Sequence, residues 1–126
     1  MSLLTRIGQI AVAVTDLDRA IAFYRDVLGL RFLFQAPPGL GFFEVGGVRL
    51  MLGLPEKPGQ DHHTSVLYYE VDDIGAAAAG LKQKKVVFES EPHRVARLAD
   101  SELWMGFFRD SEGNLLAIMQ EKPLTQ

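Results

Sequence analysis

The feature that most constrains this chain is an internal repeat. The motif Val14-Thr15-Asp16-Leu17 recurs as Val71-Asp72-Asp73-Ile74 in the second half of the sequence. Each copy follows an apolar, β-rich run, over residues 7–14 and 65–71. Each copy also precedes a stretch with the composition and spacing of a helix. A chain that repeats the order of strand and helix in this way is expected to fold as two copies of one unit.

The repeat continues beyond the two helices. Strand-like runs follow them at 31–34 and 86–88, and the sequence LGFFE at 40–44 reappears as MGFFR at 105–109. A turn comes next in each copy, at Gly46-Gly47 and at 110–114, and an apolar strand closes each copy. The second copy carries extra residues around 90–101. The repeated unit is therefore a strand, a helix and three strands.

This order predicts the α+β fold class, with two βαβββ modules in one domain spanning 1–126. Module one covers 5–54 and module two covers 63–121. The segment between them, 55–62, is the linker, because its prolines and glycine suit neither a helix nor a strand. Asp16 and Asp73 stand just ahead of the two helices, where N-caps are expected.

Composition narrows the function classes. The chain holds 13 Lys and Arg against 16 Asp and Glu, and a net charge of −3 gives no long-range attraction for nucleic acid or anionic membranes. The absence of cysteine excludes disulfides, thiolate metal sites and cysteine nucleophiles. No apolar run approaches the roughly 20 residues that span a bilayer. With no targeting segment visible, we expect a cytoplasmic protein.

Two segments resemble a known family. The sequence AVAVTDLDRAIAFYRDVLGL opens the first unit and DSEGNLLAIMQ closes the second. Both are similar to the vicinal oxygen chelate superfamily, which includes glyoxalase, bleomycin-resistance protein, methylmalonyl-CoA epimerase and extradiol dioxygenases. The resemblance covers residues 5–121 and implies a cupped, incomplete barrel sheet with the site inside. It also implies a divalent metal that acts as a Lewis acid, held by side chains from the first and last strands of each unit.

By resemblance, the four metal-ligand positions are Gln9, Met51, Val66 and Ala117. The repeat agrees, because Gln9 and Val66 are equivalent positions, and so are Met51 and Ala117. Three of the four offer no hard donor, since methionine sulfur is soft and suits copper(I). One amide oxygen cannot hold a divalent ion. We therefore expect no metal and no cofactor at the family's usual site.

Alternation along the strands extends the candidate site. Arg49 shares the face of Met51, where its guanidinium could bind an anionic ligand; the alternatives are an internal pair with Glu44 or Glu70, and an exposed edge position. Gln9 is either a ligand contact or a buried amide satisfied by a neighbour. Aromatic side chains commonly line small-molecule pockets. The candidate ligand-binding residues are Gln9, Arg49, Met51, Val66, Tyr68, Trp104 and Ala117, with core packing or a dimer contact as the alternative for the two aromatic residues.

The histidines give one catalytic candidate. His93 lies in the extra residues of the second unit, which makes it the best candidate for a general base or a ligand contact, the alternative being an ordinary loop histidine. His62 and His63 end the linker, and adjacent strand side chains point in opposite directions, so they make a poor ligand pair.

Three functions remain open at this point. The first is metal-independent binding of a small organic, possibly anionic, molecule in the cup of the sheet. The second is an enzyme of the lyase, isomerase or dioxygenase kind, with a divalent metal on relocated ligands such as Gln9, His93 and either Glu70 or Glu102. The third is a non-catalytic interaction module. In each case we expect a homodimer, because open sheets leave edges that must be covered.

Overall fold

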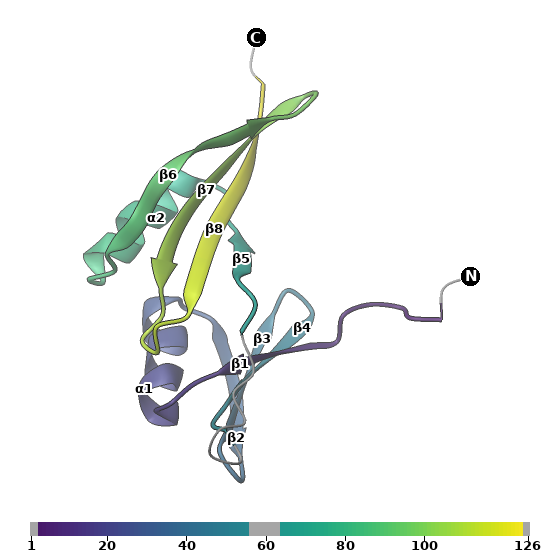
Figure 1. The fold of residues 1–126 in the computed structure, drawn as a ribbon, viewed down its shortest axis with the longest axis vertical. Coiled ribbons are helices and arrows are strands. Elements are labelled where there is room, and N and C mark those ends of the chain that lie inside the picture. The colour runs from purple at the N-terminus through teal and green to yellow at the C-terminus, as the bar shows by residue number, and fades with distance from the viewer. Residues whose placement is uncertain (1–2, 56–63, 125–126) are drawn as a thin grey trace. The chain divides into compact units, whose positions relative to one another are not determined.

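The computed structural model describes residues 3–55 and 64–124. The chain divides into two compact units, Met1–Ser65 and Val66–Gln126, each containing a sheet and a helical segment (Figure 1). Apart from Pro55, the predicted linker 55–62 lies outside the described residues, as do His62 and His63.

Unit 1 has the predicted order of strand, helix and three strands. Its elements are β1 (Gln9–Ala13), α1 (Leu17–Ala22), a π-helical turn η1 (Phe23–Val27), β2 (Arg31–Ala36), β3 (Leu40–Val45) and β4 (Val48–Gly53). The strand order in the sheet is β1-β4-β3-β2. β1 runs parallel to β4, and the other neighbours are antiparallel.

Unit 2 repeats this topology. Its elements are β5 (Leu67–Glu70), α2 (Ile74–Gln83), β6 (Phe88–Arg97), β7 (Ser101–Arg109) and β8 (Leu115–Pro123). The strand order is β5-β8-β7-β6, with β5 parallel to β8. The α+β class and the two βαβββ modules are thus confirmed. Neither sheet closes on itself, which leaves β1 and β2 as edges of one and β5 and β6 as edges of the other.

The same cap starts both helices. Asp16 is the N-cap of α1, and its carboxylate accepts a hydrogen bond from the backbone N–H of Arg19 at 3.1 Å. Asp73 does the same for α2, accepting from Ala76 N–H at 3.0 Å. Both caps satisfy a backbone donor that a helix leaves without an internal partner, which confirms the roles predicted for these acids.

In unit 1, alternate side chains of the sheet are buried beneath the helical segment. Val12 and Val14 are almost fully buried, as the alternation along β1 predicts. Tyr24 of η1 and Phe43 of β3 are also fully buried, with ring centroids 6.1 Å apart. Burying side chains of this size contributes roughly 1.5–3 kcal/mol each. This packing fixes which face of the sheet carries the helix.

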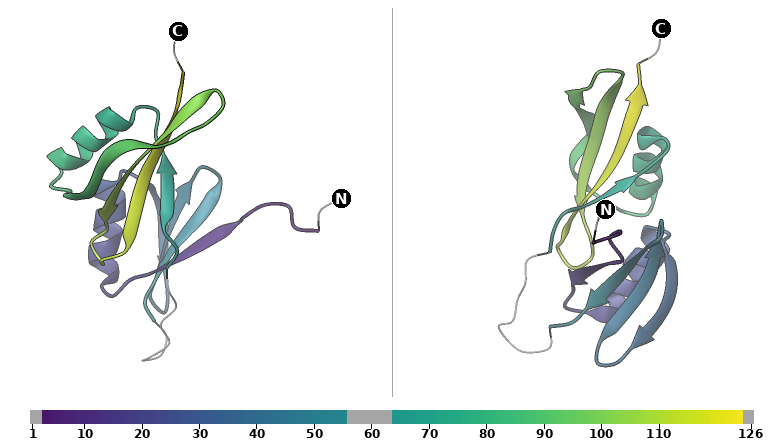
Figure 2. Two further views of the ribbon diagram at one scale, coloured as in Figure 1. Left: turned by 45° about the horizontal axis from the view of Figure 1, so that its top comes forward. Right: turned by 90° about the vertical axis from the view of Figure 1, so that its right-hand side faces the viewer.

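Unit 2 is packed in the same way. α2 contacts β6, β7 and β8, and Figure 2 shows the helix lying along one face of this sheet. Phe108 and Leu116 are fully buried, and the Phe108 ring lies 5.3 Å from that of Phe88, centroid to centroid. Phe43 and Phe108 occupy equivalent places in the two units, and both are fully buried in the core.

The extra residues of the second unit lengthen a hairpin. β6 runs from Phe88 to Arg97, well past its equivalent β2, and β7 is longer than β3 in step with it. The strand predicted at 86–88 therefore begins at Phe88 and continues through the insertion. His93 is therefore a strand residue and not the loop histidine that the sequence left as an alternative, because it pairs with Met105 within this hairpin.

Two predicted turns are confirmed. Gly46 and Gly47 connect β3 to β4, and both have positive φ angles that favour glycine. Before β8, the buried carboxylate of Asp110 organises the turn 110–114. It accepts hydrogen bonds of 2.8 Å from the backbone N–H groups of Glu112 and Asn114, and one of 2.9 Å from the Asn114 amide. Within the described residues, no helix is long and apolar enough to cross a membrane.

Tyr69 of β5 carries a buried hydroxyl that has no hydrogen-bond partner in the described part of the chain. It pairs with Ile118 of β8, which is buried, so its ring faces the same side of the sheet. Burial, and secondarily the charge of Asp110, raise the pKa of Tyr69 far above its usual value. The folded protein therefore resists ionisation of this phenol.

We expect the Tyr69→Phe substitution to leave the free energy of unfolding at neutral pH unchanged or higher by up to about 1 kcal/mol, because the lost hydroxyl has no partner. In the wild type, the unfolded chain ionises Tyr69 near its ordinary pKa of about 10, while the folded chain does not. Wild-type stability should therefore fall as the pH rises above about 10, more steeply than that of Tyr69→Phe.

Urea unfolding at neutral pH and at about pH 11 measures both effects. Tyr68→Phe, which removes an exposed hydroxyl, is the control and should behave as the wild type does. A neutral-pH loss of about 1 kcal/mol or more in Tyr69→Phe would contradict the expectation, since that is the contribution of a typical hydrogen bond.

Candidate functional site

The face of the unit 1 sheet that does not carry the helix is its open face. One row of neighbouring side chains crosses it: Ala11 of β1 pairs with Met51 of β4, Met51 with Phe42 of β3, and Phe42 with Phe34 of β2. Met51 occupies one of the positions predicted to bind a ligand. A β-bulge between Phe32 and Phe34 brings Phe34 onto this face, with its ring stacked on Phe42 at a centroid distance of 4.7 Å.

Arg49 extends this row toward the start of β4. Its Cζ atom lies 5.5 Å from the centroid of the Phe42 ring, a cation–π distance. The register places Arg49 opposite Glu44, but the Glu44 carboxylate accepts the backbone N–H of Gly47 at 2.6 Å. Among the described residues, no carboxylate forms an ion pair with Arg49. The internal pair with Glu44 or Glu70 that the sequence left open is therefore not formed there.

Gln9 lies at the start of β1, opposite Arg49 in the register. Its amide donates a hydrogen bond to the Met51 sulfur at 3.7 Å. Gln9 is exposed, so it is not the buried amide that the sequence offered as an alternative. Arg49 and Met51 share one face, as the alternation along the strand predicted, and Gln9 lies beside them. Together they combine a cation, an amide and a thioether beside two aromatic rings.

The open face of unit 2 carries the equivalent row. Tyr68 of β5 pairs with Ala117 of β8, and Ala117 pairs with Phe107 of β7. The rings of Tyr68 and Phe107 meet edge to face at 5.9 Å, and Ala117 is fully buried between them in the register. Val66 precedes Tyr68 by two residues, just before β5, and is half-buried. That Gln9 and Tyr68 contact one ligand stays a prediction.

Trp104 lies on the other side of the unit 2 sheet. It alternates with Met105 and pairs with Gln120, on the same side as buried Phe108. Its indole N–H donates to Glu102 at 3.1 Å, and Lys122 Nζ lies 4.0 Å from the ring centroid. The indole donor, followed by the guanidinium of Arg94, lowers the pKa of Glu102. Trp104 is therefore separated from Tyr68, and Glu102 is engaged in this cluster.

His93 is exposed and pairs with Met105, which places it on the open face of unit 2. Its Nδ1 lies 2.8 Å from the carbonyl oxygen of Glu91. Because a carbonyl only accepts, this contact assigns the proton of a neutral ring to Nδ1 and leaves Nε2 as the basic atom. The ring is thus oriented so that Nε2 can accept a proton.

Sequence reasoning missed three aromatic residues of the open faces: Phe34, Phe42 and Phe107. The repeated Phe-Phe pair contained a signal for two of them. In each pair the second ring is buried beneath the helix, so the first must face the other way. Phe34 had no such signal, because the bulge in β2 shifts the alternation.

Comparisons with known proteins agree with the topology. The model of the Glyoxalase/Bleomycin resistance protein/Dioxygenase superfamily matches residues 6–118. Among curated proteins, the mitochondrial methylmalonyl-CoA epimerase of Mus musculus is 37% identical over a match that covers 66% of this chain and 55% of that protein. The Homo sapiens epimerase is 33% identical, with 73% and 61% covered. The match thus spans little more than half the length of these relatives.

Solved structures share the fold. Lactoylglutathione lyase from Agrobacterium tumefaciens superposes with a TM-score of 0.76 and 25% identity, over 93% of this chain and 94% of that chain. TnmS3, an antibiotic binding protein from Streptomyces sp. CB03234, superposes with a TM-score of 0.73 and 21% identity, over 97% and 100%. Both superpositions extend over nearly the whole of this chain.

The side chains at the four positions implied for a divalent metal do not fit one. Gln9 offers one amide oxygen, and its nitrogen already donates to the soft sulfur of Met51. Val66 and Ala117 have no donor atom, and Ala117 is buried between two rings. No group of three or more His, Asp or Glu side chains able to hold a metal ion occurs within 3–55 and 64–124.

We expect protein from zinc- or nickel-supplemented medium to carry well under one metal ion per chain after dialysis, because one amide oxygen cannot replace four hard ligands. Elemental analysis of the dialysed protein measures this. One tightly bound ion per chain, lost in Gln9→Ala, would contradict the expectation and favour an enzyme with relocated ligands.

Proposed function

This chain belongs to the Glyoxalase/Bleomycin resistance protein/Dioxygenase superfamily, and we propose that it is a metal-independent binder of a small organic anion. The observation that carries the proposal is that Arg49 is exposed and forms no ion pair with a described residue. Its guanidinium is exposed, lies over the Phe42 ring, and has no carboxylate partner in the described part of the chain. A cation presented in this way offers a paired N–H fork to a carboxylate.

The surroundings of Arg49 define the rest of the ligand. Phe42 and Phe34 form a stack that ends in an exposed ring, because Phe34 is 46% exposed. A flat apolar group would bury that ring surface, while its carboxylate reaches the guanidinium. Gln9 adds an amide able to hydrogen bond to a polar substituent. The favoured ligand is therefore a flat organic acid of modest size.

The relatives support an anionic ligand without identifying it. Methylmalonyl-CoA epimerase, by its name, acts on a molecule whose malonyl group carries a carboxylate. The fold is also compatible with binding alone, since TnmS3 is an antibiotic binding protein. Epimerase chemistry in this chain would need a base at the ligand, and His93, whose Nδ1 contacts the Glu91 carbonyl, is the candidate for that role.

We expect naphthylacetate, or another aromatic carboxylate from a screened panel, to raise the melting temperature of the wild type. Arg49→Met should weaken this binding by about 1.5 kcal/mol, roughly tenfold in Kd, which is the lower end for a charged hydrogen bond because Arg49 is exposed. Titration calorimetry on both proteins measures the difference. The uncharged naphthylacetamide should bind both proteins equally weakly.

Arg97→Met, which removes an exposed arginine of unit 2, is the matched control and should bind as the wild type does. Equal affinity of the wild type and Arg49→Met for every carboxylate that binds would contradict the role of Arg49. If no carboxylate shifts the melting temperature, the interaction module takes the place of this proposal. Deuterium exchange into methylmalonyl-CoA that is lost in His93→Gln would establish an enzyme instead.

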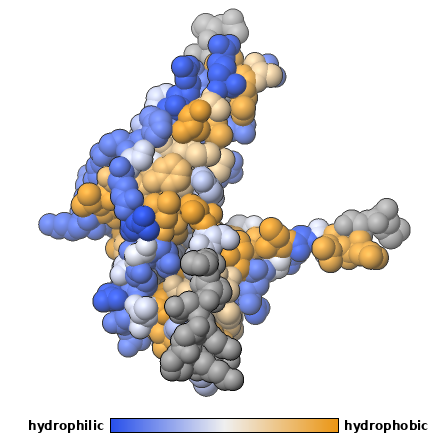
Figure 3. Space-filling model, viewed as in Figure 1, coloured by the Kyte–Doolittle hydropathy of each residue, from blue (hydrophilic) through white to orange (hydrophobic). Residues whose placement is uncertain are grey.

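We further propose a homodimer assembled through β1 and the segment before it. β1 is an edge strand, and residues 3–8 continue it with exposed apolar side chains. Leu3 is 98% exposed, Leu4 84% and Ile7 66%. Figure 3 shows this segment as partly hydrophobic surface. An uncovered edge beside exposed apolar side chains is a surface that pairs readily with another copy.

Light scattering is therefore expected to give a mass about twice the 14.0 kDa of one chain. The triple substitution Leu3→Asn, Leu4→Asn and Ile7→Asn should give a monomer, because it removes the apolar contacts. Val87→Asn is the control, since Val87 is 82% exposed in unit 2 and should not affect assembly. A wild-type monomer at micromolar to millimolar concentration would refute the proposal.

A further inference from the structure

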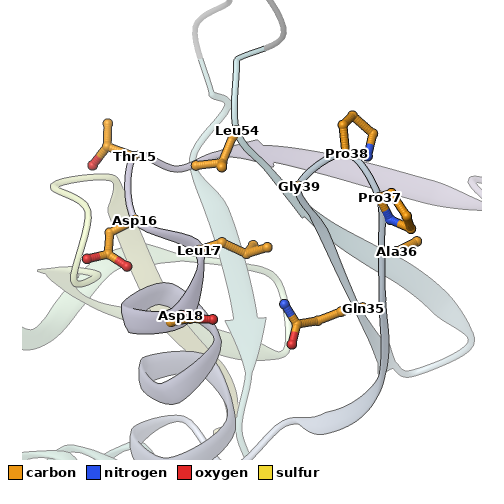
Figure 4. A pocket seen from close by; sticks show the side chains of 10 residues that line it. All are labelled: Thr15, Asp16, Leu17, Asp18, Gln35, Ala36, Pro37, Pro38, Gly39 and Leu54. Carbon is orange, nitrogen blue, oxygen red and sulfur yellow. The ribbon is translucent and has the colours of Figure 1, made fainter.

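Unit 1 contains a second concave surface at the end of its sheet. A cavity of about 720 Å³ lies between the start of α1, the turn that joins β2 to β3, and the residue after β4 (Figure 4). Its volume is within the range of pockets that bind small molecules. Its lining includes the side chains of Leu17, Asp18, Gln35, Pro37, Pro38 and Leu54.

This cavity is on the helix side of the sheet, separate from the open face. Gln35 pairs with Gly41 across β2 and β3. A Cβ atom at Gly41 would meet Ile21 of α1 at 3.0 Å and Leu17 at 3.5 Å, so this face lies against the helix. Arg49 alternates with buried Leu50 and faces the other way. The cavity therefore takes no part in the proposed anion site.

The charge of the cavity is negative. Both of its ionic side chains are carboxylates, Asp16 and Asp18, and neither lysine nor arginine lines it. Asp16 caps α1 through the N–H of Arg19. Asp18 is exposed and has no hydrogen-bond or ion-pair partner in the described part of the chain. Figure 4 shows Asp18 on the helix and Gln35 on β2 pointing toward each other across the cavity.

We propose that this cavity binds a small organic cation, an amine with an apolar body. An ammonium group donates up to three hydrogen bonds, and the Asp18 carboxylate and the Gln35 carbonyl oxygen are the acceptors on the two walls. Leu17, Leu54 and the ring carbons of Pro37 and Pro38 provide the apolar surface. The site is independent of the anion site, so the protein has two ligand surfaces of opposite charge preference.

The test uses naphthylmethylamine, with naphthylmethanol as the neutral analogue and naphthylacetate as the anionic one. Amide chemical shifts of the labelled wild type locate each probe by NMR. The ammonium probe should shift the amides of 15–18 and of Gln35, Ala36 and Gly39, and the other two should leave them unchanged. Asp18→Asn should weaken ammonium binding about three- to fivefold, the range of an exposed charge pair.

Two further variants complete the test. Glu121→Gln removes one exposed carboxylate from unit 2 and should bind the amine as the wild type does. Gln35→Met should weaken binding without changing the net charge. Arg49→Met should leave amine binding intact while it weakens naphthylacetate, so failure of one site is distinguishable from failure of the other.

The inference is overturned if the amine leaves the amides of 15–18 and of Gln35, Ala36 and Gly39 unshifted at millimolar concentration. It is also overturned if naphthylmethanol binds there equally well, or if Asp18→Asn weakens the amine no more than Glu121→Gln does. The melting temperature of each free variant shows whether the fold is intact. Should Asp18→Asn be unstable, the comparison of Gln35→Met with the wild type decides between the outcomes.

Discussion

Burial of every second strand side chain beneath one helical segment is the constraint on which both units depend. Val12 and Phe43 in unit 1, and Phe108 and Leu116 in unit 2, fill the space under their helices. Because strand side chains alternate, this packing also determines which residues face the other way. Arg49, Met51 and their neighbours lie on the open face because the alternate side chains of their strands fill the core.

The sequence was sufficient for the topology and for part of the site. A repeat that matches in both halves predicts equal units, and the apolar face of β1 specifies its orientation. The family resemblance supplied the positions of Gln9 and Met51, and alternation along β4 added Arg49 to the face of Met51; in the structure the Gln9 amide contacts the Met51 sulfur. The order of the elements and the face of Arg49 could be predicted because both depend on local periodicity, which the chain expresses without reference to distant segments.

The predictions that failed, or were not made, depend on departures from that periodicity. A bulge in β2 turns Phe34 toward the open face. In β6, the pairing register with β7 shifts between Ser90 and His93, and again before Ala96. An insertion that lengthens a hairpin and one that forms a loop can have similar amino-acid compositions. The position of His93 in a strand could therefore not be predicted from the sequence. Asp18 and Gln35 face each other only because a helix and a hairpin pack together in the tertiary structure. Local sequence patterns do not predict that packing.

Met51 and Ala117 stand at the same place in two copies of one backbone, yet their surroundings have diverged. One is a thioether beside an amide, and the other is a methyl group between two rings. Neither packs beneath a helix, although Ala117 is fully buried on its open face and Met51 is only partly buried. Duplication of such a unit creates two equivalent surfaces whose side chains can diverge separately. A single architecture can in this way acquire new chemistry by point mutation while it retains its topology.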